Sequence, residues 1–197
     1  MKKLLLFLCS VMLVLSTAGM AGATTYNFIP NPIDGLSWLD HSYWYTWGID
    51  QAIPEDETIQ SATLSIDNLK YWADSGYNDL WVDLLHSAHE GVIRETGSDS
   101  GDHFAGLGSI ELLHFVNLTT APQDVSREFT DLEIASLTGY ASDGNFGFSF
   151  DPDCHFDTTG VSFTVNTSSC PPVPEPATML LLGCGLAGLG FVRKKRS

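Results

Sequence analysis

Basic residues are scarce in the middle of this 197-residue chain, where Lys70, Arg94 and Arg127 are the only lysines and arginines between residues 24 and 174. All but one of the chain's 24 aspartates and glutamates fall in the same stretch. Nucleic acid and anionic lipid are themselves negatively charged, so a surface of this kind would repel both. The composition therefore argues against nucleic acid as a partner. It is compatible with a soluble extracellular protein, with divalent cations, with neutral sugars, or with a merely solvating acidic surface.

Cysteine is also rare, and only two of the four cysteines, Cys154 and Cys170, lie between the apolar ends of the chain. In an oxidising compartment an even pair of cysteines is first interpreted as a disulfide. Closing a loop of this size contributes about 3 kcal/mol in the chain-entropy model. The sequence therefore predicts a disulfide between Cys154 and Cys170, with free thiols or a zinc site as weaker alternatives.

Long hydrophobic runs are missing too, since neither apolar segment reaches the roughly 20 residues that span a bilayer comfortably. The first segment, residues 4–15, follows Lys2 and Lys3 and precedes the small residues Ala-Gly-Ala at 21–23. A short basic region, an apolar core and an A-x-A site are the parts of a cleaved secretory signal. The sequence predicts a signal peptide with a signal helix over residues 1–23, and a retained anchor is the alternative.

The second apolar segment, residues 177–192, carries no charge. As a helix it would reach about 24 Å, which is short for a hydrocarbon core of about 30 Å unless the bilayer thins. Four basic residues follow it directly: Arg193, Lys194, Lys195 and Arg196. The pattern predicts a transmembrane helix whose basic end stays on the cytoplasmic side and leaves the body outside. A buried core helix is the alternative.

Pro174, Glu175 and Pro176 stand just before this segment. The order of a Pro-Glu-Pro motif, an apolar stretch and a basic terminus resembles the PEP-CTERM sorting signal of exported bacterial proteins. In that family an exosortase, a membrane-embedded transpeptidase-like enzyme with a cysteine nucleophile, processes the chain near the motif. The resemblance implies that residues 171–197 are a sorting tail, that an exosortase is a partner, and that the destination is the cell surface or an extracellular polysaccharide matrix such as a biofilm.

The body, residues 24–170, has apolar residues that recur at period two, which is typical of strands with one face in a core and one toward solvent. The rows fall within residues 43–49, 62–66, 80–84, 110–118, 146–150 and 161–165. They predict an all-β, jelly-roll-like antiparallel β-sandwich, with a short helical turn at 132–137. The phrases at 146–165 and 40–49 are also similar to sandwich domains of other PEP-CTERM proteins.

Most of the tryptophans and tyrosines fall between Trp38 and Trp81. Flat aromatic faces pack against the C–H faces of sugars, so exposed rings would suit polysaccharide binding. Aromatic residues are also favoured in strands and cores, so core packing is the alternative. The candidate sugar-binding residues are Trp38, Trp44, Trp47 and Trp72.

Asp151, Asp153 and Asp157 form an oxygen-rich cluster around a predicted turn. Carboxylate oxygens are the ligands that Ca²⁺ prefers, so the cluster is a candidate calcium site. The spacing is not that of an EF-hand, because His155 takes the fifth position and the glycine of the sixth is absent. An ordinary acidic turn is the alternative.

No arranged catalytic motif occurs in the chain. The order in His86-Ser87-Ala88-His89-Glu90 is not that of a zinc protease, and the many acids single out no glycosidase pair. The sequence predicts an exported, non-catalytic structural or adhesive protein. A carbohydrate-binding module for exopolysaccharide and a surface glycoside hydrolase are the alternatives.

Overall fold

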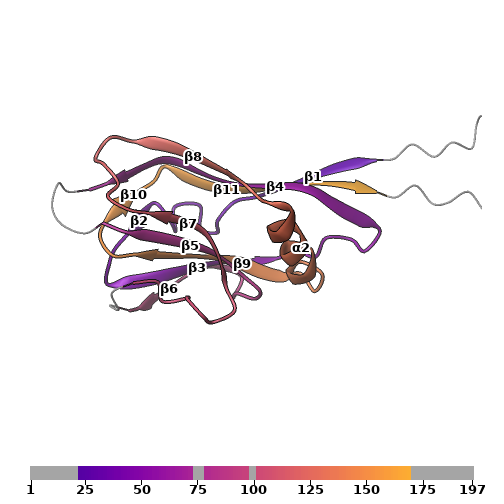
Figure 1. Cartoon of the computed structure of the whole chain (residues 1–197), viewed down its shortest axis with the longest axis horizontal. Coiled ribbons are helices and arrows are strands. Elements are labelled where there is room, and N and C mark those ends of the chain that lie inside the picture. Colours follow the sequence, from indigo (N-terminus) through magenta and orange to yellow (C-terminus); the bar gives the residue numbers. More distant parts are fainter. Residues whose placement is uncertain (1–21, 73–77, 98–100, 170–197) are drawn as a thin grey trace, which may run out of the picture. The chain divides into compact units, whose positions relative to one another are not determined.

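Two antiparallel β-sheets lie face to face in the computed structural model, which describes residues 22–72, 78–97 and 101–169 (Figure 1). Both sheets belong to one compact unit, Ala23–Ser168. Every strand pair recorded within these sheets is antiparallel. This arrangement confirms the predicted all-β sandwich.

The first sheet has six strands, and its order is β1-β11-β4-β10-β2 with β8 also paired to β4. Its members are β1 (Ala23–Phe28), β2 (Trp38–Leu39), β4 (Glu57–Tyr71), β8 (Gln123–Glu128), β10 (Phe156–Asp157) and β11 (Gly160–Ser169). The second sheet has five strands in the order β6-β3-β9-β5-β7. Its members are β3 (Tyr43–Asp50), β5 (Leu80–Leu85), β6 (Gly91–Thr96), β7 (Ile110–Phe115) and β9 (Asn145–Pro152).

The core lies between the sheets and is filled by the apolar rows that the period-two pattern predicts. Phe163 of β11 is at its centre, with its ring centroid 4.8 Å from that of Phe148 on β9. The rows that are buried as predicted are Ala62, Leu64 and Ile66; Leu80, Val82 and Leu84; Phe146, Phe148 and Phe150; and Val161, Phe163 and Val165. Alternation along each strand is therefore what directs these side chains inward.

One part of the strand prediction is wrong, because β5 and β9 are buried on both faces and not on one. Asp83, Ser149 and Asp151 point away from the core and are nevertheless buried. The segment 101–109 packs over them, with the backbone N–H of His103 donating to Asp151 Oδ2 at 2.6 Å and Phe104 buried beside it. The five-stranded sheet is thus covered on its outer side by a loop.

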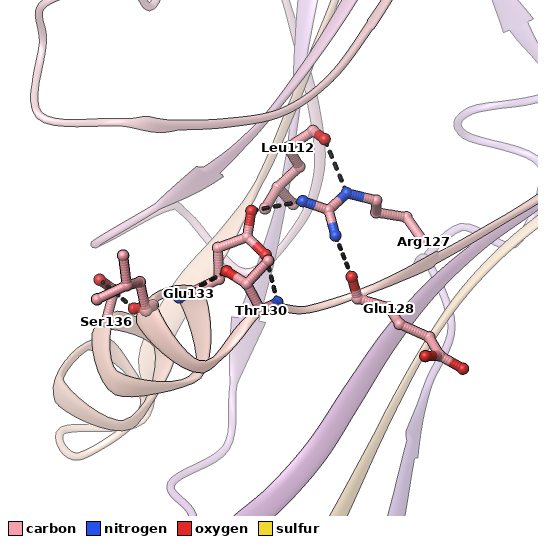
Figure 2. A network of polar contacts seen from close by, with 7 residues as sticks. Leu112, Arg127, Glu128, Thr130, Glu133 and Ser136 are labelled. Atoms are coloured by element: carbon pink, nitrogen blue, oxygen red, sulfur yellow. Dashed lines mark hydrogen bonds and ion pairs between the residues drawn. The ribbon is translucent and has the colours of Figure 1, made fainter.

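The predicted helical turn is confirmed and is longer than expected, because helix α2 spans Asp131–Tyr140. Thr130 begins it with a capping box: Glu133 N donates to Thr130 Oγ1 at 3.4 Å, and Thr130 N donates to Glu133 Oε2 at 2.6 Å. Arg127 reaches the same carboxylate, with Nη2 2.6 Å from Glu133 Oε1, and Nε donates to the carbonyl of Leu112 at 3.0 Å (Figure 2). The network fixes the chain between β8 and α2.

All three basic residues of the body have structural partners. Lys70 Nζ lies 3.3 Å from Asp157 Oδ2, Arg127 pairs with Glu133, and the Arg94 guanidinium lies 4.3 Å above the centre of the Tyr43 ring. None of these three cations is therefore an isolated group for binding an anion.

The predicted signal peptide at 1–23 and the predicted transmembrane helix at 177–192 lie almost wholly outside the described residues. Within the part of the chain that the structure describes, no helix has the length and apolar character needed to cross a membrane. Cys154 is described, and its Sγ lies 3.3 Å from the Tyr71 hydroxyl. Because Cys170 is outside the described residues, the disulfide stays a prediction.

Candidate functional site

The candidate site lies on the outer face of the six-stranded sheet, where β2, β10 and the end of β4 run side by side. The register pairs Phe156 of β10 with Leu39 of β2 on one side and with Tyr71 of β4 on the other. All three side chains are buried, so this row faces the core. The rows on either side of it must therefore face outward, since side chains alternate along a strand.

One outward row contains Trp38, Asp157 and Lys70, which the register pairs across the three strands. The other row continues the pairing by one residue and contains Asp40, His155 and Trp72. The backbone N–H of Trp72 donates to the His155 carbonyl at 3.1 Å, which ties the end of β4 to the start of β10. Two tryptophans, a histidine, two aspartates and a lysine are thereby gathered on the outer face of these three strands.

The two tryptophans touch each other edge to face. Their ring centroids are 5.3 Å apart with an interplanar angle of 66°, and both lie within 6.0 Å of the His155 ring. Trp38 is 44% exposed and Trp72 is 57% exposed, although both are large apolar side chains. We call Trp38, Trp72 and His155 the aromatic cluster. An exposed apolar cluster of this kind marks a surface suited to contact with a ligand or a partner.

A polar group borders the aromatic cluster. Asp40 Oδ1 lies 3.5 Å from His41 Nδ1 and 3.7 Å from His155 Nε2, and it accepts a hydrogen bond from Ser42 N at 2.9 Å. The pKa of Asp40 is lowered, chiefly by the Ser42 backbone hydrogen bond and further by the two histidines, against the opposing effect of partial burial. Asp40 is therefore held as a carboxylate between two imidazoles.

The structure divides the predicted sugar-binding tryptophans. Trp38 and Trp72 come together as described, although they are far apart in the sequence. Trp44 lies on the other sheet, where its ring stacks on His103 with centroids 5.0 Å apart and borders a cavity of about 350 Å³. The prediction for Trp47 is wrong: it is 2% exposed and packs on Phe148, because residues 45, 47 and 49 of β3 face the core.

The predicted calcium ligands are not brought together. Asp151 is buried beneath the 101–109 loop, and Asp153 Oδ1 accepts a long hydrogen bond from Gly101 N at 3.4 Å. Asp157 belongs to the opposite sheet and pairs with Lys70. The chain leaves β9 and enters β10 between these residues, so closeness in sequence does not become closeness in space.

Two features of the molecule are not predicted by its sequence. One is Asp83, whose pKa burial raises to about 6, as it does for Asp151. The other is the grouping of Asp40, His41 and His155. One potential metal-ligand atom from each of these residues lies within 4.8 Å of the other two. No local spacing indicates this grouping, because it depends on β2 pairing with β10 from a distant part of the chain.

Comparison with known proteins concerns the end of the chain. Residues 172–195 match the PEP-CTERM protein-sorting motif. This chain carries a PEP-CTERM sorting motif. The match includes Pro174, Glu175 and Pro176 and most of the basic terminus, as the resemblance implied. No curated protein matches the chain.

The PEP-CTERM motif marks the chain as an exported protein that is sorted to the surface or the exterior through an exosortase. Its residues lie outside those that the structure describes, so its geometry is not part of the site above. The sandwich and the PEP-CTERM motif are accordingly two separate sources of functional information. The motif indicates where the protein is sent, and the aromatic cluster indicates which surface of the sandwich is suited to bind a partner.

Proposed function

We propose that the chain is a protein of the cell surface or the extracellular polysaccharide matrix, in which the β-sandwich has a non-catalytic structural or adhesive role. The observation that supports this proposal is the match of residues 172–195 to the PEP-CTERM motif. Pro174, Glu175 and Pro176 would be recognised and the chain processed near them. Residues 177–192 would hold the precursor in the membrane, and the basic residues that follow would fix its orientation.

The non-catalytic part of the proposal rests on the chemistry of the acidic residues. A glycoside hydrolase needs two carboxyl groups facing each other across a cleft that admits the substrate. Asp83 and Asp151 have the raised pKa that an acid catalyst requires, but they are 1% and 7% exposed. One oxygen of each carboxyl group already accepts a hydrogen bond, from Ser149 Oγ in Asp83 and from His103 N in Asp151. A structural role for the sandwich therefore accounts better for these groups.

The sorting proposal is tested by changing the motif in a host that has an exosortase. We expect the wild-type chain in the external fraction and the triple variant Pro174→Ala, Glu175→Ala, Pro176→Ala in the membrane fraction. The matched control is Pro171→Ala, which changes a neighbouring proline just before the matched residues and should behave as wild type. Retention of the wild-type chain and the triple variant alike in the membrane fraction would refute processing and leave an ordinary anchor.

A second candidate function is carbohydrate binding, which the exposed aromatic cluster favours. Trp38 and Trp72 present apolar rings on a surface where Asp157, Lys70 and Asp40 supply polar groups at the margin. Rings flanked by polar groups are the combination that sugar sites use. The edge-to-face packing of the two rings gives a bent surface and not a flat platform.

Affinity electrophoresis in gels containing a neutral glucan tests this candidate. We expect the wild-type protein to be retarded, and Trp38→Ala or Trp72→Ala to weaken binding several-fold, as loss of an aromatic contact does. Trp44→Ala is the control, because it removes a tryptophan on the other sheet. Equal loss in the Trp44 variant, or no retardation of the wild type by any neutral polysaccharide tried, would contradict a sugar site at the aromatic cluster.

The finer description of the sandwich as jelly-roll-like is also a proposal. It is supported by the connections, since β3 and β4, β4 and β5, β7 and β8, and β8 and β9 are consecutive in sequence and belong to opposite sheets. Repeated crossing between two sheets is typical of Greek-key and jelly-roll sandwiches.

A further inference from the structure

The side chains of Asp40, His41 and His155 converge on one point beside the aromatic cluster. Asp40 Oδ1 is the shared centre, 3.5 Å from His41 Nδ1 and 3.7 Å from His155 Nε2. Among the residues described by the structure, this is the one group of three or more histidine, cysteine, aspartate and glutamate side chains whose ligand atoms all lie within 4.8 Å. The two imidazole rings also meet edge to face, with centroids 4.7 Å apart.

These distances fit the requirements of a tetrahedral metal ion. Zn²⁺ binds nitrogen and oxygen ligands at about 2.0–2.1 Å, so two ligands of a tetrahedral site are about 3.3–3.4 Å apart. Both distances from Asp40 Oδ1 exceed this separation by only a few tenths of an ångström. The ligand atoms of the two histidines lie within 4.8 Å of each other, and the histidine that would have to move closer is His41, whose side chain is 51% exposed.

Two of the three ligands are held in place by the sheet. Asp40 directly follows β2: its N–H donates to the buried Tyr45 hydroxyl at 3.0 Å, and its Oδ1 accepts from Ser42 N. His155 directly precedes β10, and its carbonyl accepts from Trp72 N. Only His41 lies on a turn without such a tether. A largely preformed site loses less conformational entropy on binding.

The ligand types determine which cations suit the site. Two imidazoles and one carboxylate favour borderline transition metals such as Zn²⁺, Ni²⁺ and Cu²⁺ over Ca²⁺ and Mg²⁺, which prefer oxygen ligands. The net charge of the chain, −15, adds a long-range attraction for any divalent cation. Three protein ligands also leave the fourth tetrahedral position open to water or to a partner group.

We propose that Asp40, His41 and His155 form a divalent transition-metal site, with Zn²⁺ as its ion, on the outer face of the six-stranded sheet. Asp40 Oδ1, His41 Nδ1 and His155 Nε2 are the ligand atoms. The site adjoins Trp38 and Trp72, so a bound ion lies at the edge of the same exposed surface. The inference stands on the sandwich alone and does not depend on how the chain is sorted.

Equilibrium dialysis of the full chain against Zn²⁺ alone, followed by metal analysis, tests the proposal. We expect one ion bound per chain with an affinity that falls at least about tenfold in His41→Gln and in His155→Gln. The matched control is His114→Gln, since His114 Nε2 lies 3.4 Å from Asp79 and its ring stacks on Trp81 at 4.7 Å. His114 has a carboxylate and a tryptophan as neighbours but belongs to no metal-ligand group among the residues that the structure describes, so its variant should bind within about twofold of wild type.

Co²⁺ provides a spectroscopic readout of the same site. Four-coordinate Co²⁺ gives intense visible absorption bands, and we expect these bands in the wild type and in His114→Gln but not in His41→Gln. Because His41 lies half exposed on a turn, its replacement should leave the far-ultraviolet circular dichroism unchanged, which separates loss of a ligand from loss of the fold. Wild-type affinity no higher than that of His41→Gln, or equal loss in His114→Gln, would overturn the proposal.

Discussion

Asp83 is a carboxyl group in an unfavourable place, on the outer side of β5 beneath the 101–109 loop. Only one of its oxygens has a partner, since Ser149 Oγ donates to Oδ2 at 2.9 Å and Oδ1 is buried without a hydrogen bond. Burial raises its pKa to about 6, with the negative charges of Asp102, Glu111 and Asp151 adding to the effect. Ionised Asp83 therefore works against the folded state.

The pH dependence follows from the direction of this shift. At low pH the Asp83 carboxyl is protonated in both the folded and the unfolded chain, so it does not lower the free energy of unfolding. As pH rises above 3.8, the ordinary pKa of an aspartate, the unfolded chain ionises first and the free energy of unfolding falls. This loss of stability is complete above about pH 6, where Asp83 is ionised in the folded chain as well. We expect Asp83→Asn to raise the free energy of unfolding by about 1 kcal/mol at pH 7.5, after allowance for solvent screening, and by much less at pH 4. Urea denaturation at the two pH values measures this.

An exposed aspartate provides the control for this prediction. Asp143→Asn changes the same chemical group in a turn, at a position where the side chain is exposed. The variant should change the free energy of unfolding by no more than a few tenths of a kcal/mol at either pH. A gain for Asp83→Asn that is equal at pH 4 and pH 7.5 would show that charge is not the cause.

Helix α2 depends on its first turn more than on its length or its apolar face, because only Glu133 and Leu137 of its ten residues are buried. The capping box satisfies the backbone amides of Thr130 and Glu133, and Arg127 Nη2 donates to the other oxygen of the Glu133 carboxylate (Figure 2). We expect Thr130→Ala to lower the free energy of unfolding by about 0.5–2 kcal/mol, the usual cost of losing an N-cap side chain. Thermal or urea unfolding measures the loss.

Thr138 gives a control within the same helix. Its hydroxyl donates to the Ile134 carbonyl at 2.8 Å, which duplicates a bond that the helix already makes, and its side chain is exposed. Thr138→Ala should be neutral or slightly stabilising, since alanine is the better helix former. Equal destabilisation by the two variants would mean that the cap contributes nothing specific.

The strands differ in how far the local sequence alone predicts them. The apolar rows of β4, β5, β9 and β11 were predicted because two-residue alternation is visible without knowledge of neighbours. The strands β6 and β8 were missed because their sequences, GVIRET and QDVSRE, are largely polar and remain partly exposed. Neighbouring strands determine where such segments lie, and local pattern does not.

At the scale of the molecule, the two sheets are joined by aromatic packing around Phe163. Its ring contacts those of Phe148, Phe129, Phe28 and Phe146, with centroid distances from 4.8 to 6.2 Å. We expect Phe163→Ala to lower the free energy of unfolding by about 3–5 kcal/mol, because it removes a fully buried ring from both sheets at once. Val116→Ala, at a position 56% exposed, is the control and should cost less than about 0.5 kcal/mol.

The candidate site illustrates the limit of prediction from one sequence. Trp38 and Trp72 were selected by composition, but nothing local shows that they meet, or that Trp47 turns into the core. Asp40 and His155 come together only because β2 pairs with β10, two strands of two residues each. The sorting motif is the opposite case, since its order of residues is contiguous and needs no fold to be identified.

The central claim, that the chain is an exported protein processed at its PEP-CTERM motif, is tested most directly by the intact mass of the protein recovered from outside the cell. We expect a mass that lacks the signal peptide and also lacks roughly the last 20 residues, with the new end close to Pro174. A recovered protein whose mass includes the whole sequence up to Ser197 would contradict processing at the motif, however it reached the exterior.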